Sequence, residues 1–473
     1  MSTISNNNYY YSIASIKSVL DKAISSVYDN IDCYSTSPGK DFTRNRKLNC
    51  VDTIKYILML SNKSIQSDLM NHFLVSEDMP SASALCQQRQ KLQSSAFQRV
   101  FSLFTSHFTN YKTYNGYYLL ACDGSDINIS HNKNDSSTYH INTSATKGYN
   151  QLHLNALYDV LNGIYVDVNV DTATKTRECS ALEDMIKDKN YPDKSIIICD
   201  RGYEKYNLLA TCIESSQKFI IRVKDIKSNG ILSTVTLPDE SFDMHITKRI
   251  TRLQTNEVKE DERYTMLMNS SGPFDYLPYD QDYYEMNLRV IRFKITEDTY
   301  ECLVTNLTED EMRFEEFKEI YHLRWEIETS FRDLKYTLGM IYFHSSDQEM
   351  IRQEIYASLT IFNFSKIIIN NSPPKQESTW KYKYKINFKT ATTNIRLYLT
   401  GKIDEIELEL RIKKFLVPIR PGRKFSRNVK GQCAKTSSYY AAIIKPGICS
   451  TTITVIPGFD VLLSISLSFN RST

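Results

Sequence analysis

The sequence predicts an α/β fold in which helices cover both faces of a sheet and a helical region comes first. Three observations predict it. Apolar residues recur at spacings of three and four over the first hundred residues, apolar runs of strand length begin at residue 117, and helical stretches alternate with these runs. Strands that are apolar throughout are typical of a sheet covered on both faces. With 473 residues, the chain has room for about two to four domains.

The N-terminal region, residues 1–115, is predicted to be helical. Its first apolar stripe consists of Ile13, Ile16, Leu20, Ile24 and Val27. The stretch SASALCQQRQKL (81–92) predicts a second, capped helix. The basic residues Arg44, Arg46, Lys47 and Arg89 suit contacts with DNA phosphates and base edges. A solvated helical face is the alternative explanation for these charges.

The central region, residues 116–372, is predicted to hold the sheet. Its predicted strands are YYLLAC (117–122), LHLNALYDV (152–160), IYVDVNV (164–170), SIIIC (195–199) and KFIIRVK (218–224). The turn LNG joins the second and third of them into a hairpin, and RECSALEDMIKD precedes SIIIC as a helix. Residues from about 225 to 300 form a β-strand-rich insertion. TEDE (308–311) predicts a capping box at the start of the next helices.

Composition excludes several classes of protein. The net charge of +3 is too small to identify a partner, so local charge must do so. None of the ten cysteines forms a CxxC pair, which argues against a zinc site with close ligand spacing, and Cys122 and Cys199 fit buried positions in strands. No export signal is apparent, so a reducing cytoplasm is expected. The apolar stretch 451–469 is interrupted by Pro457, Gly458 and Asp460, so no membrane span is expected.

The stretch YHLRWEIETSFRDLK (321–335) is the first candidate for chemistry. On an α-helix, at about 100° per residue, Tyr321, Arg324, Glu328 and Lys335 fall within a sector of roughly 60°. Glu326 falls on the far side and is expected to be a solvated surface residue. The functional sector borders an apolar band of Leu323, Ile327, Phe331 and Leu334. An ion pair between Arg324 and Glu328, with no further role, is the alternative.

Two aspartates complete a candidate metal site. Asp123 and Asp200 each follow an apolar strand, where a charge without a partner is costly. A single aspartate in such a place is commonly a cap or turn residue, but two of them with Glu328 suit one or two Mg²⁺ ions. Asp126 competes with Asp123 for the first position. Asp123 is preferred if the strand ends at Cys122.

A family resemblance rests on these residues. The pattern Y-x2-R-x3-E-x6-K is matched by Tyr321, Arg324, Glu328 and Lys335 without a gap. It resembles the YREK signature of the DDE transposases of the IS-four insertion-sequence family. CDGSD and ICDRGY resemble that family's two aspartate blocks, and FTRNRKL and RPGRKFSR (420–427) resemble its flanking regions.

The resemblance implies an RNase H-like catalytic core with the β-rich insertion before the glutamate helix. It implies cut-and-paste DNA transposition, in which Asp123, Asp200 and Glu328 hold two Mg²⁺ ions, with Mn²⁺ as a substitute. Tyr321, Arg324 and Lys335 then hold the terminal phosphates. The implied partners are double-stranded DNA, as terminal repeats and as target, and a second copy of the chain on synapsed DNA. The implied place of action is the bacterial nucleoid. Trp325 is expected in the core, with packing near a base as the alternative.

The C-terminal region, residues 373–473, is basic. The segment 411–435 has nine cations and no acidic residue, which suits backbone binding to DNA. Its candidate contacts are Arg420, Arg423, Lys424 and Arg427. A basic tail without a specific partner is the alternative there. For the whole chain, the alternatives are a catalytically inactive, transposase-derived DNA-binding protein and an RNase H-like nuclease without strand transfer.

Overall fold

The N-terminal region forms helices, as its apolar periodicity predicts. The computed structural model describes residues 4–6, 11–44, 46–73, 79–108, 112–141, 148–172, 178–267, 273–297 and 299–420. The helices of the N-terminal region are α1 (Ile13–Asp29), η1 (Ile31–Cys33), α2 (Cys50–Met59), α3 (Ile65–Phe73), α4 (Ala82–Arg89) and α5 (Ser94–Ser106). Ser12 and Ser81 each accept a hydrogen bond from the backbone N–H three residues later, so α1 and α4 begin at side-chain caps. The predicted apolar stripe of α1 is buried.

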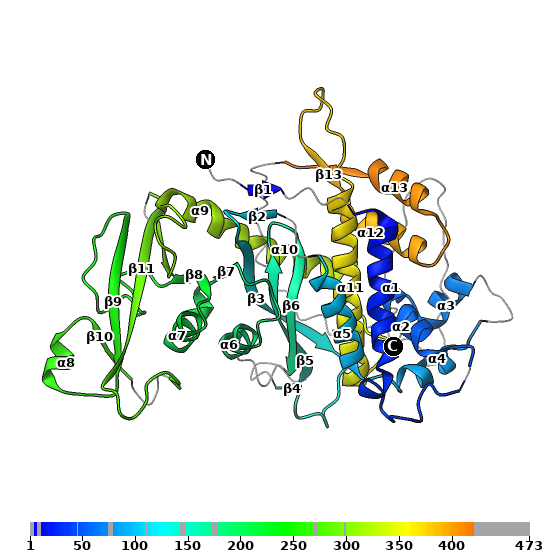
Figure 1. The fold of residues 1–473 in the computed structure, drawn as a ribbon, viewed down its shortest axis with the longest axis horizontal. Coiled ribbons are helices and arrows are strands. Elements are labelled where there is room, and N and C mark those ends of the chain that lie inside the picture. The colour runs from blue at the N-terminus through cyan, green and yellow to red at the C-terminus, as the bar shows by residue number, and fades with distance from the viewer. Residues whose placement is uncertain are drawn as a thin grey trace, which may run out of the picture.

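Ten strands of the described chain form one mixed sheet (Figure 1). Its order is β10-β9-β11-β12-β8-β7-β3-β5-β4, and β6 also pairs with β5. These strands are β3 (Tyr118–Ile129), β4 (Tyr139–His140), β5 (Tyr149–Asp159), β6 (Ile164–Thr172), β7 (Ser195–Cys199), β8 (Lys218–Val223), β9 (Phe242–Thr251), β10 (Tyr264–Met266), β11 (Tyr283–Thr296) and β12 (Thr299–Thr305). The short strands β1 (Ile4–Asn6) and β2 (Lys112–Tyr114) pair separately. The predicted mixed α/β class is therefore confirmed.

The register in the middle of the sheet determines where the predicted aspartates lie. β5 and β6 are the predicted hairpin, β5 is antiparallel to β3, and β7 is parallel to both β3 and β8. Cys122 of β3 lies opposite Cys199 of β7, and both thiols are buried and free. Asp123 and Asp200 each come directly after one member of this pair. They therefore occupy equivalent positions in the parallel register of β3 and β7.

The first strand is longer than predicted. β3 continues through Asp123 to Ile129, because residues 120–129 keep pairing with β5 beyond the point where β7 ends. The expectation that the strand ends at Cys122 was therefore wrong. Asp123 lies inside a strand, at the position where only one of its two neighbouring strands continues.

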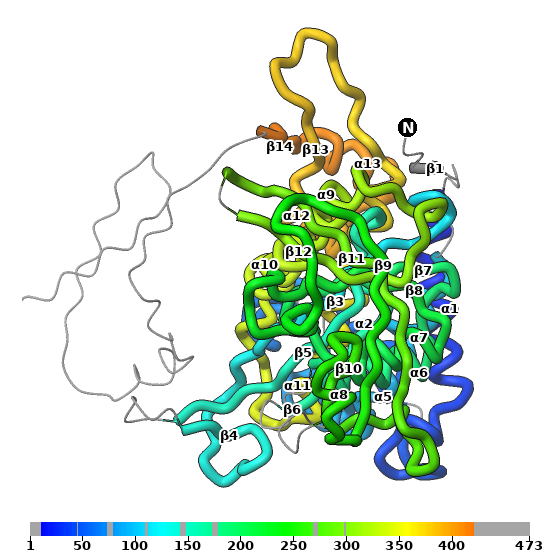
Figure 2. Tube along the Cα trace, turned by 90° about the vertical axis from the view of Figure 1, so that its left-hand side faces the viewer, coloured from blue at the N-terminus to red at the C-terminus, as the bar shows by residue number. Residues whose placement is uncertain are grey.

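The strand-rich segment between β8 and the signature helices extends the same sheet. β12 pairs with β8, β11 with β12, and β9 with β11, all antiparallel. The short helix α8 (Asn256–Glu260) lies between β9 and β10. Figure 2 shows these strands in front of the rest of the molecule. The strand-rich segment is thus continuous with the sheet through backbone hydrogen bonds.

Helices cover both faces of the sheet. On one face, α6 (Glu178–Asp188) and α7 (Tyr206–Glu214) bury Leu120, Ile197 and Phe219 (Figure 1). On the other, α9 (Phe314–His322) packs on Leu119, Ile196 and Ile220. Residues of β3, β5 and β6 that include Ala121 and Leu154 join a core shared with α1, α5 and α11 (Gln348–Asn371). The alternation of helices and apolar strands predicted this coverage.

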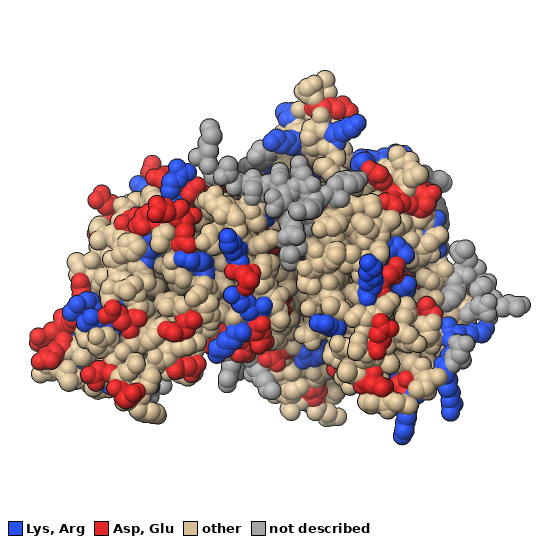
Figure 3. Space-filling view, viewed as in Figure 1, with Lys and Arg blue, Asp and Glu red and all other residues tan. Residues whose placement is uncertain are grey.

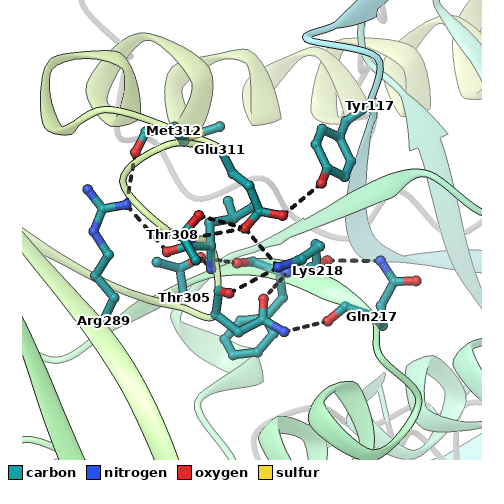
Figure 4. A network of polar contacts seen from close by, with 11 residues as sticks. Tyr117, Gln217, Lys218, Arg289, Thr305, Thr308, Glu311 and Met312 are labelled. Atoms are coloured by element: carbon teal, nitrogen blue, oxygen red, sulfur yellow. Dashed lines mark hydrogen bonds and ion pairs between the residues drawn. The ribbon is translucent and has the colours of Figure 1, made fainter.

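A polar network holds the loop that leads into α9 (Figure 4). Glu311 accepts hydrogen bonds from the Tyr117 hydroxyl at 2.8 Å, the Lys218 ammonium at 2.8 Å and the Thr308 N–H at 2.9 Å. Thr308 and Glu311 thus make a predicted capping-box contact, but they close a turn and α9 begins only at Phe314. These contacts fix the loop between β12 and α9 against Tyr117 and β8.

The C-terminal part of the described chain adds α12 (Phe388–Leu399), α13 (Glu405–Lys414) and the pair β13 (Tyr384–Ile386) and β14 (Leu416–Pro418). The loop between α11 and β13 projects from the molecule (Figures 1 and 2). The description ends at residue 420, so Arg423, Lys424, Arg427 and the stretch 451–469 lie outside it. Among the described residues, no helix is long and apolar enough to cross a bilayer.

Candidate active site

The signature stretch is a helix with two irregular turns. After α9 come the 3₁₀ turn η4 (Leu323–Trp325), α10 (Glu326–Arg332) and the π turn η5 (Asp333–Thr337). The expectation of one regular α-helix from 321 to 335 was therefore wrong in detail. The predicted apolar band still faces the core, because Ile327, Phe331 and Leu334 are buried.

Arg324 lies between two of the predicted carboxylates. Its side chain is 4 % exposed, and Nη1 lies 4.0 Å from Oδ2 of Asp123 while Nη2 lies 3.5 Å from Oε1 of Glu328. Glu328 is half-buried, whereas Glu326 is exposed. The structure thus brings Glu328 next to Asp123 on the helix face that also carries Arg324.

The carboxyl group of Asp123 is perturbed by its surroundings. Burial raises the pKa of Asp123 to about 6, and the negative charges of Asp200 and Glu328 act in the same direction. The Gly124 N–H, which donates to Oδ1 at 2.9 Å, and the Arg324 guanidinium oppose that rise. The charges of Asp200 and Glu328 are therefore close enough to act on Asp123.

Asp200 is held at the end of β7 by its own turn. Its Oδ1 accepts a hydrogen bond of 2.7 Å from the Gly202 N–H, at the start of the 3₁₀ turn η3 (Arg201–Tyr203). This is the cap role expected of a lone aspartate after a strand. Oδ1 of Asp200 therefore accepts the hydrogen bond that forms the turn. The negative charge of Asp200 also raises the pKa of Arg324.

The donor chemistry of the three carboxylates fits a divalent cation with oxygen ligands. Burial and the charges of Asp200 and Glu328 disfavour the ionised form of Asp123, and a bound cation would favour it. Within the described ranges, no three acidic, histidine or cysteine side chains are grouped closely enough to hold a metal. Asp123, Asp200 and Glu328 are therefore neighbours, but they are not grouped as closely as the ligands of one metal ion.

The other two signature residues are Tyr321 and Lys335. Tyr321 is 3 % exposed, its hydroxyl has no hydrogen-bond partner within the described structure, and burial raises its pKa to about 12. Lys335 is half-buried; burial lowers its pKa, and the Asp126 carboxylate opposes that shift. Tyr321 thus lies in the core next to Arg324, and Lys335 lies near Asp126.

Trp325 does not occupy the core. Its side chain is 46 % exposed, and the Arg324 guanidinium carbon lies 4.9 Å from the centre of its ring. The expectation of a core tryptophan was therefore wrong. The 3₁₀ turn directs Trp325 outward while Arg324 turns inward.

Sequence reasoning missed a charged group beside the cluster. His153 of β5 is buried, with Nδ1 2.8 Å from Oδ1 of Asp126 and Nε2 3.2 Å from Oε1 of Glu178. Burial alone lowers the pKa of His153, but the two carboxylates outweigh it and raise the pKa to about 9. Asp126 and His153 are cross-strand partners, so the β3–β5 register was the signal that would have revealed the pair.

Gly124 permits the close approach of this group. A Cβ at Gly124 would lie 2.5 Å from both Oε1 of Glu178 and Nε2 of His153. Asp126 is thus engaged by His153, while Asp123, one residue before Gly124, faces Arg324.

The predicted DNA-contacting residues of the N-terminal region occupy two kinds of place. Arg44, Arg46 and Lys47 are exposed. Arg44 and Arg46 line a cavity of about 410 Å³ together with Lys40 and Lys91. On the face that Figure 3 shows, Lys and Arg side chains lie near Asp and Glu side chains at many places, with wide uncharged areas between them. This cavity is therefore a local concentration of positive charge in a molecule of mixed surface charge.

Arg89 has a different place. Its side chain is 1 % exposed, pairs with Glu354 at 2.8 Å and donates to Gln353 at 2.8 Å. These contacts join α4 to α11, and a duplex would reach Arg89 only if they opened. We therefore leave Arg89 out of the proposed DNA contacts. Arg420, at the end of the described chain, is exposed.

Comparison with known proteins identifies the family of the chain. Residues 114–364, just over half of the chain, match the family described as "Transposase DDE domain". The chain belongs to this transposase family. The transposase DDE domain begins at β2 and ends within α11, so it includes β3 with Asp123, the turn after β7 with Asp200, and the signature helices.

Among solved structures, this transposase is similar to one determined by cryo-electron microscopy, the piggyBac transposase synaptic complex with hairpin DNA. The TM-score is 0.43 and the sequence identity 11%, over 93% of this chain and 91% of that chain. No curated protein matches the sequence of this transposase.

Proposed function

We propose that this transposase cleaves DNA at the ends of an insertion sequence and joins those ends to target DNA, in a reaction that requires Mg²⁺. One observation carries the proposal. The parallel register of β3 and β7 brings Asp123 and Asp200 to adjacent positions, and α10 adds Glu328 beside them. Carboxylates collected from two strand ends and a helix supply the oxygen ligands that Mg²⁺ prefers.

In the proposed reaction, Asp123, Asp200 and Glu328 would hold the metal. The bound metal supplies charge stabilisation for the attacking and leaving oxygens of an in-line phosphoryl displacement. Arg324 is already buried beside Asp123 and Glu328. Its planar guanidinium can bind a phosphate there through two parallel hydrogen bonds. Tyr321 contributes a hydroxyl without a partner and Lys335 an ammonium group. Water is the first nucleophile, and the freed 3′-hydroxyl of the element is the second.

The central strands support the assignment of an RNase H-like core. β6, β5 and β3 are antiparallel, β7 and β8 continue in parallel with β3, and the strand-rich segment precedes the glutamate helix. We assign residues 116–372 to this catalytic region, with the insertion at about 225–300. Residues 1–115 and 373–473 supply further contacts to terminal-repeat and target DNA, and two copies of the chain act together on synapsed ends.

The N-terminal contacts centre on the basic cavity of Lys40, Arg44, Arg46 and Lys91, with Lys47 nearby. A phosphate backbone fits such a site because several cations converge there without a carboxylate in the lining. Arg420 and the basic residues Arg423, Lys424 and Arg427 extend the proposed contacts at the other end of the chain.

The test is a cleavage and strand-transfer assay on DNA that carries the repeats flanking the gene. It is run with Mg²⁺, with Mn²⁺ and with EDTA, for wild type and for Asp123→Asn and Asp200→Asn. We expect metal-dependent cutting and joining in wild type, and loss of both in each variant with DNA binding retained.

Three other outcomes have distinct meanings. Binding without cutting by wild type would favour a DNA-binding protein without activity, and cutting without joining would favour a nuclease. Full cleavage by either variant would remove that aspartate from the site.

A further inference from the structure

A second cavity lies between the N-terminal helices and α12. Its volume is about 410 Å³, and its lining comes from α2, α3, α12 and the π turn that carries Lys335. Met59, Leu69 and Leu397 supply apolar wall, whereas Lys63, Arg396 and Lys402 supply positive charge. None of these residues belongs to the carboxylate cluster, so the cavity is separate from the candidate active site.

Arg396 is the unusual member of this lining. Its Nε is buried and has no hydrogen-bond partner in the described structure, and its guanidinium forms no ion pair within 4.0 Å there. Burial lowers the pKa of Arg396, and Asp68 is the acidic group that opposes the shift. A buried guanidinium nitrogen without a hydrogen-bond partner is costly, and an anion that accepts its hydrogen bond would offset that cost.

Asp68 is the acidic residue of the cavity lining, and its carboxylate is held against Ser61. Its Oδ2 accepts from the Ser61 N–H at 2.8 Å, and its Oδ1 accepts from the Ser61 hydroxyl at 2.7 Å. Against this single carboxylate the lining places Lys63, Arg396 and Lys402. His72 also lines the cavity. Burial lowers the pKa of His72 most, the positive charge of Lys402 lowers it further, and Asp52 opposes both. The cavity is therefore electropositive and suits an anion.

Three parts of the chain meet at this cavity. Thr337, two residues after Lys335, lines it together with the loop after α2 and with α12. The loop presses closely on the end of the π turn, since a Cβ at Gly339 would lie 1.6 Å from Oδ1 of Asn62. An anion bound here would contact the N-terminal helices, the C-terminal helices and the end of the signature stretch at once.

We propose that this cavity binds a phosphate group, with Arg396 as its main ligand and Lys402 as the second cation. Guanidinium matches phosphate in shape and charge, and the buried Nε supplies a donor that water does not satisfy. We assign this phosphate to the DNA backbone, and this assignment of its source rests on the proposed function. A free phosphate is the other source of the same chemistry.

The first arm of the test uses inorganic phosphate. Thermal unfolding of the full chain is followed in phosphate and in chloride of matched ionic strength, for wild type and Arg396→Met. Wild type should be stabilised by phosphate. Arg396→Met should not respond to phosphate and should melt higher than wild type in chloride, because it lacks the buried charge. A residue with only a structural role would lower the melting temperature in both salts.

Two further variants support this arm. Arg411→Met removes an exposed guanidinium of α13 that pairs with Glu407, and its phosphate response should equal that of wild type. Lys402→Met removes an exposed side chain that folding does not require, and it should weaken the response even if Arg396→Met fails to fold.

The second arm uses a DNA duplex. The logarithm of the DNA-binding constant is plotted against the logarithm of the salt concentration. If the cavity holds a backbone phosphate, the negative slope of this plot should be shallower by about 0.9 in Arg396→Met than in wild type. An unchanged slope together with a lost phosphate response would assign the site to free phosphate. No specific phosphate response in wild type and equal slopes for the two proteins would overturn the proposal.

The phosphate arm does not depend on catalysis. It is repeated in the Glu328→Gln background, where the stabilisation by phosphate should persist. A chain that keeps this response but never cleaves DNA would contradict the proposed function and leave the phosphate site standing.

Discussion

The contacts of Arg324 and Glu328 in the fold differ from those that their sequence spacing alone predicts. As a pair four residues apart on a helix, they would form an ordinary ion pair. In the fold, the same guanidinium also lies 4.0 Å from Asp123, and all three side chains are at least half-buried. Glu326, two residues before Glu328, is exposed. The two glutamates therefore differ in position rather than in chemistry.

Glu328→Gln and Glu326→Gln form a matched pair for the first prediction. We expect Glu328→Gln to reduce the rate of DNA cleavage by at least about 100-fold, because loss of a direct ligand costs more than loss of an outer contact to a metal site. Glu326→Gln should stay within about twofold of wild type, since surface substitutions away from such sites change little. Single-turnover cleavage rates in saturating Mg²⁺ measure both. Equal losses in the two variants would contradict the assignment of Glu328.

His153 makes a prediction about pH. Its pKa in the folded chain is raised to about 9, against 6.5 for an unperturbed histidine. The stabilisation from its two carboxylate partners is therefore complete below pH 6.5 and is lost as the pH rises through 9. We expect about 1 to 2 kcal/mol, given that Asp126 and Glu178 are partly exposed to solvent and salt.

The measurement for His153 is urea unfolding of wild type and His153→Gln between pH 6 and 9.5. The difference in unfolding free energy between the two should shrink as the pH rises. His131→Gln, which removes an exposed histidine, serves as the control and should show a constant difference. A difference for His153→Gln that does not vary with pH would contradict the ion pairing described.

At the scale of elements, irregular turns decide which side chains reach the site. The 3₁₀ turn η4 lies between α9 and α10, so Arg324 is buried while its neighbours His322 and Trp325 are exposed. The π turn follows α10 and carries Lys335. These turns sit where α9 and α10 must both pack on the sheet. The position of α9 in turn depends on the loop before it, which Glu311 fastens to β8.

Glu311→Gln tests that loop. We expect a loss of about 1 to 2 kcal/mol of unfolding free energy, because the contacts to Lys218 and Tyr117 lose their charge-assisted acceptor. Burial raises the pKa of Glu311, but its hydrogen bonds outweigh burial and lower the pKa to about 2. The loss should therefore be full above pH 4.5 and shrink as the pH falls toward 2.

Chemical denaturation at pH 7 and pH 3 measures this effect. Glu315→Gln, which changes an exposed glutamate in the first turn of α9, should cost only a few tenths of a kcal/mol. If the two variants were equally destabilised, the Glu311 network would not be what holds the loop.

At the scale of the whole molecule, the N-terminal helices and the catalytic region share one core. α1 and α5 pack against α11, and α5 and α11 also pack against β6. The buried pair Arg89–Glu354 joins α4 to α11 as well. The proposed boundary at residues 115–116 therefore divides the chain by sequence but passes through a continuous apolar interior.

Deletion of residues 1–115 tests this continuity. We expect the remaining chain to lose cooperative thermal unfolding, because the apolar face of α11 that packs on α5 would be exposed to water. Circular dichroism and calorimetry measure it, with a chain ending at residue 420 as the control that should unfold cooperatively. A deleted chain that unfolds as sharply as the control would show that residues 1–115 form an independent domain.

Much of the fold was predictable because its signals are local. The stripe of α1, the cap of α4, the β5–β6 hairpin and the apolar strands β7 and β8 follow from the spacing of neighbouring residues. The length of β3, the 3₁₀ and π turns and the exposure of Trp325 were not predictable. They depend on strand partners and packing surfaces that lie far away in the sequence.

The sequence by itself determined the mixed α/β class and the candidates Asp123, Asp200 and Glu328, because apolar periodicity and motif spacing are properties of short segments. Only the tertiary structure decided that Asp123 and Asp200 are adjacent, that Arg324 stands between Asp123 and Glu328, and that Arg89 is an internal ion pair. The β3–β7 register and the packing of α4 on α11 join residues separated by tens to hundreds of positions. Burial and charge acquire their energetic effect only through such contacts, which a linear pattern does not contain.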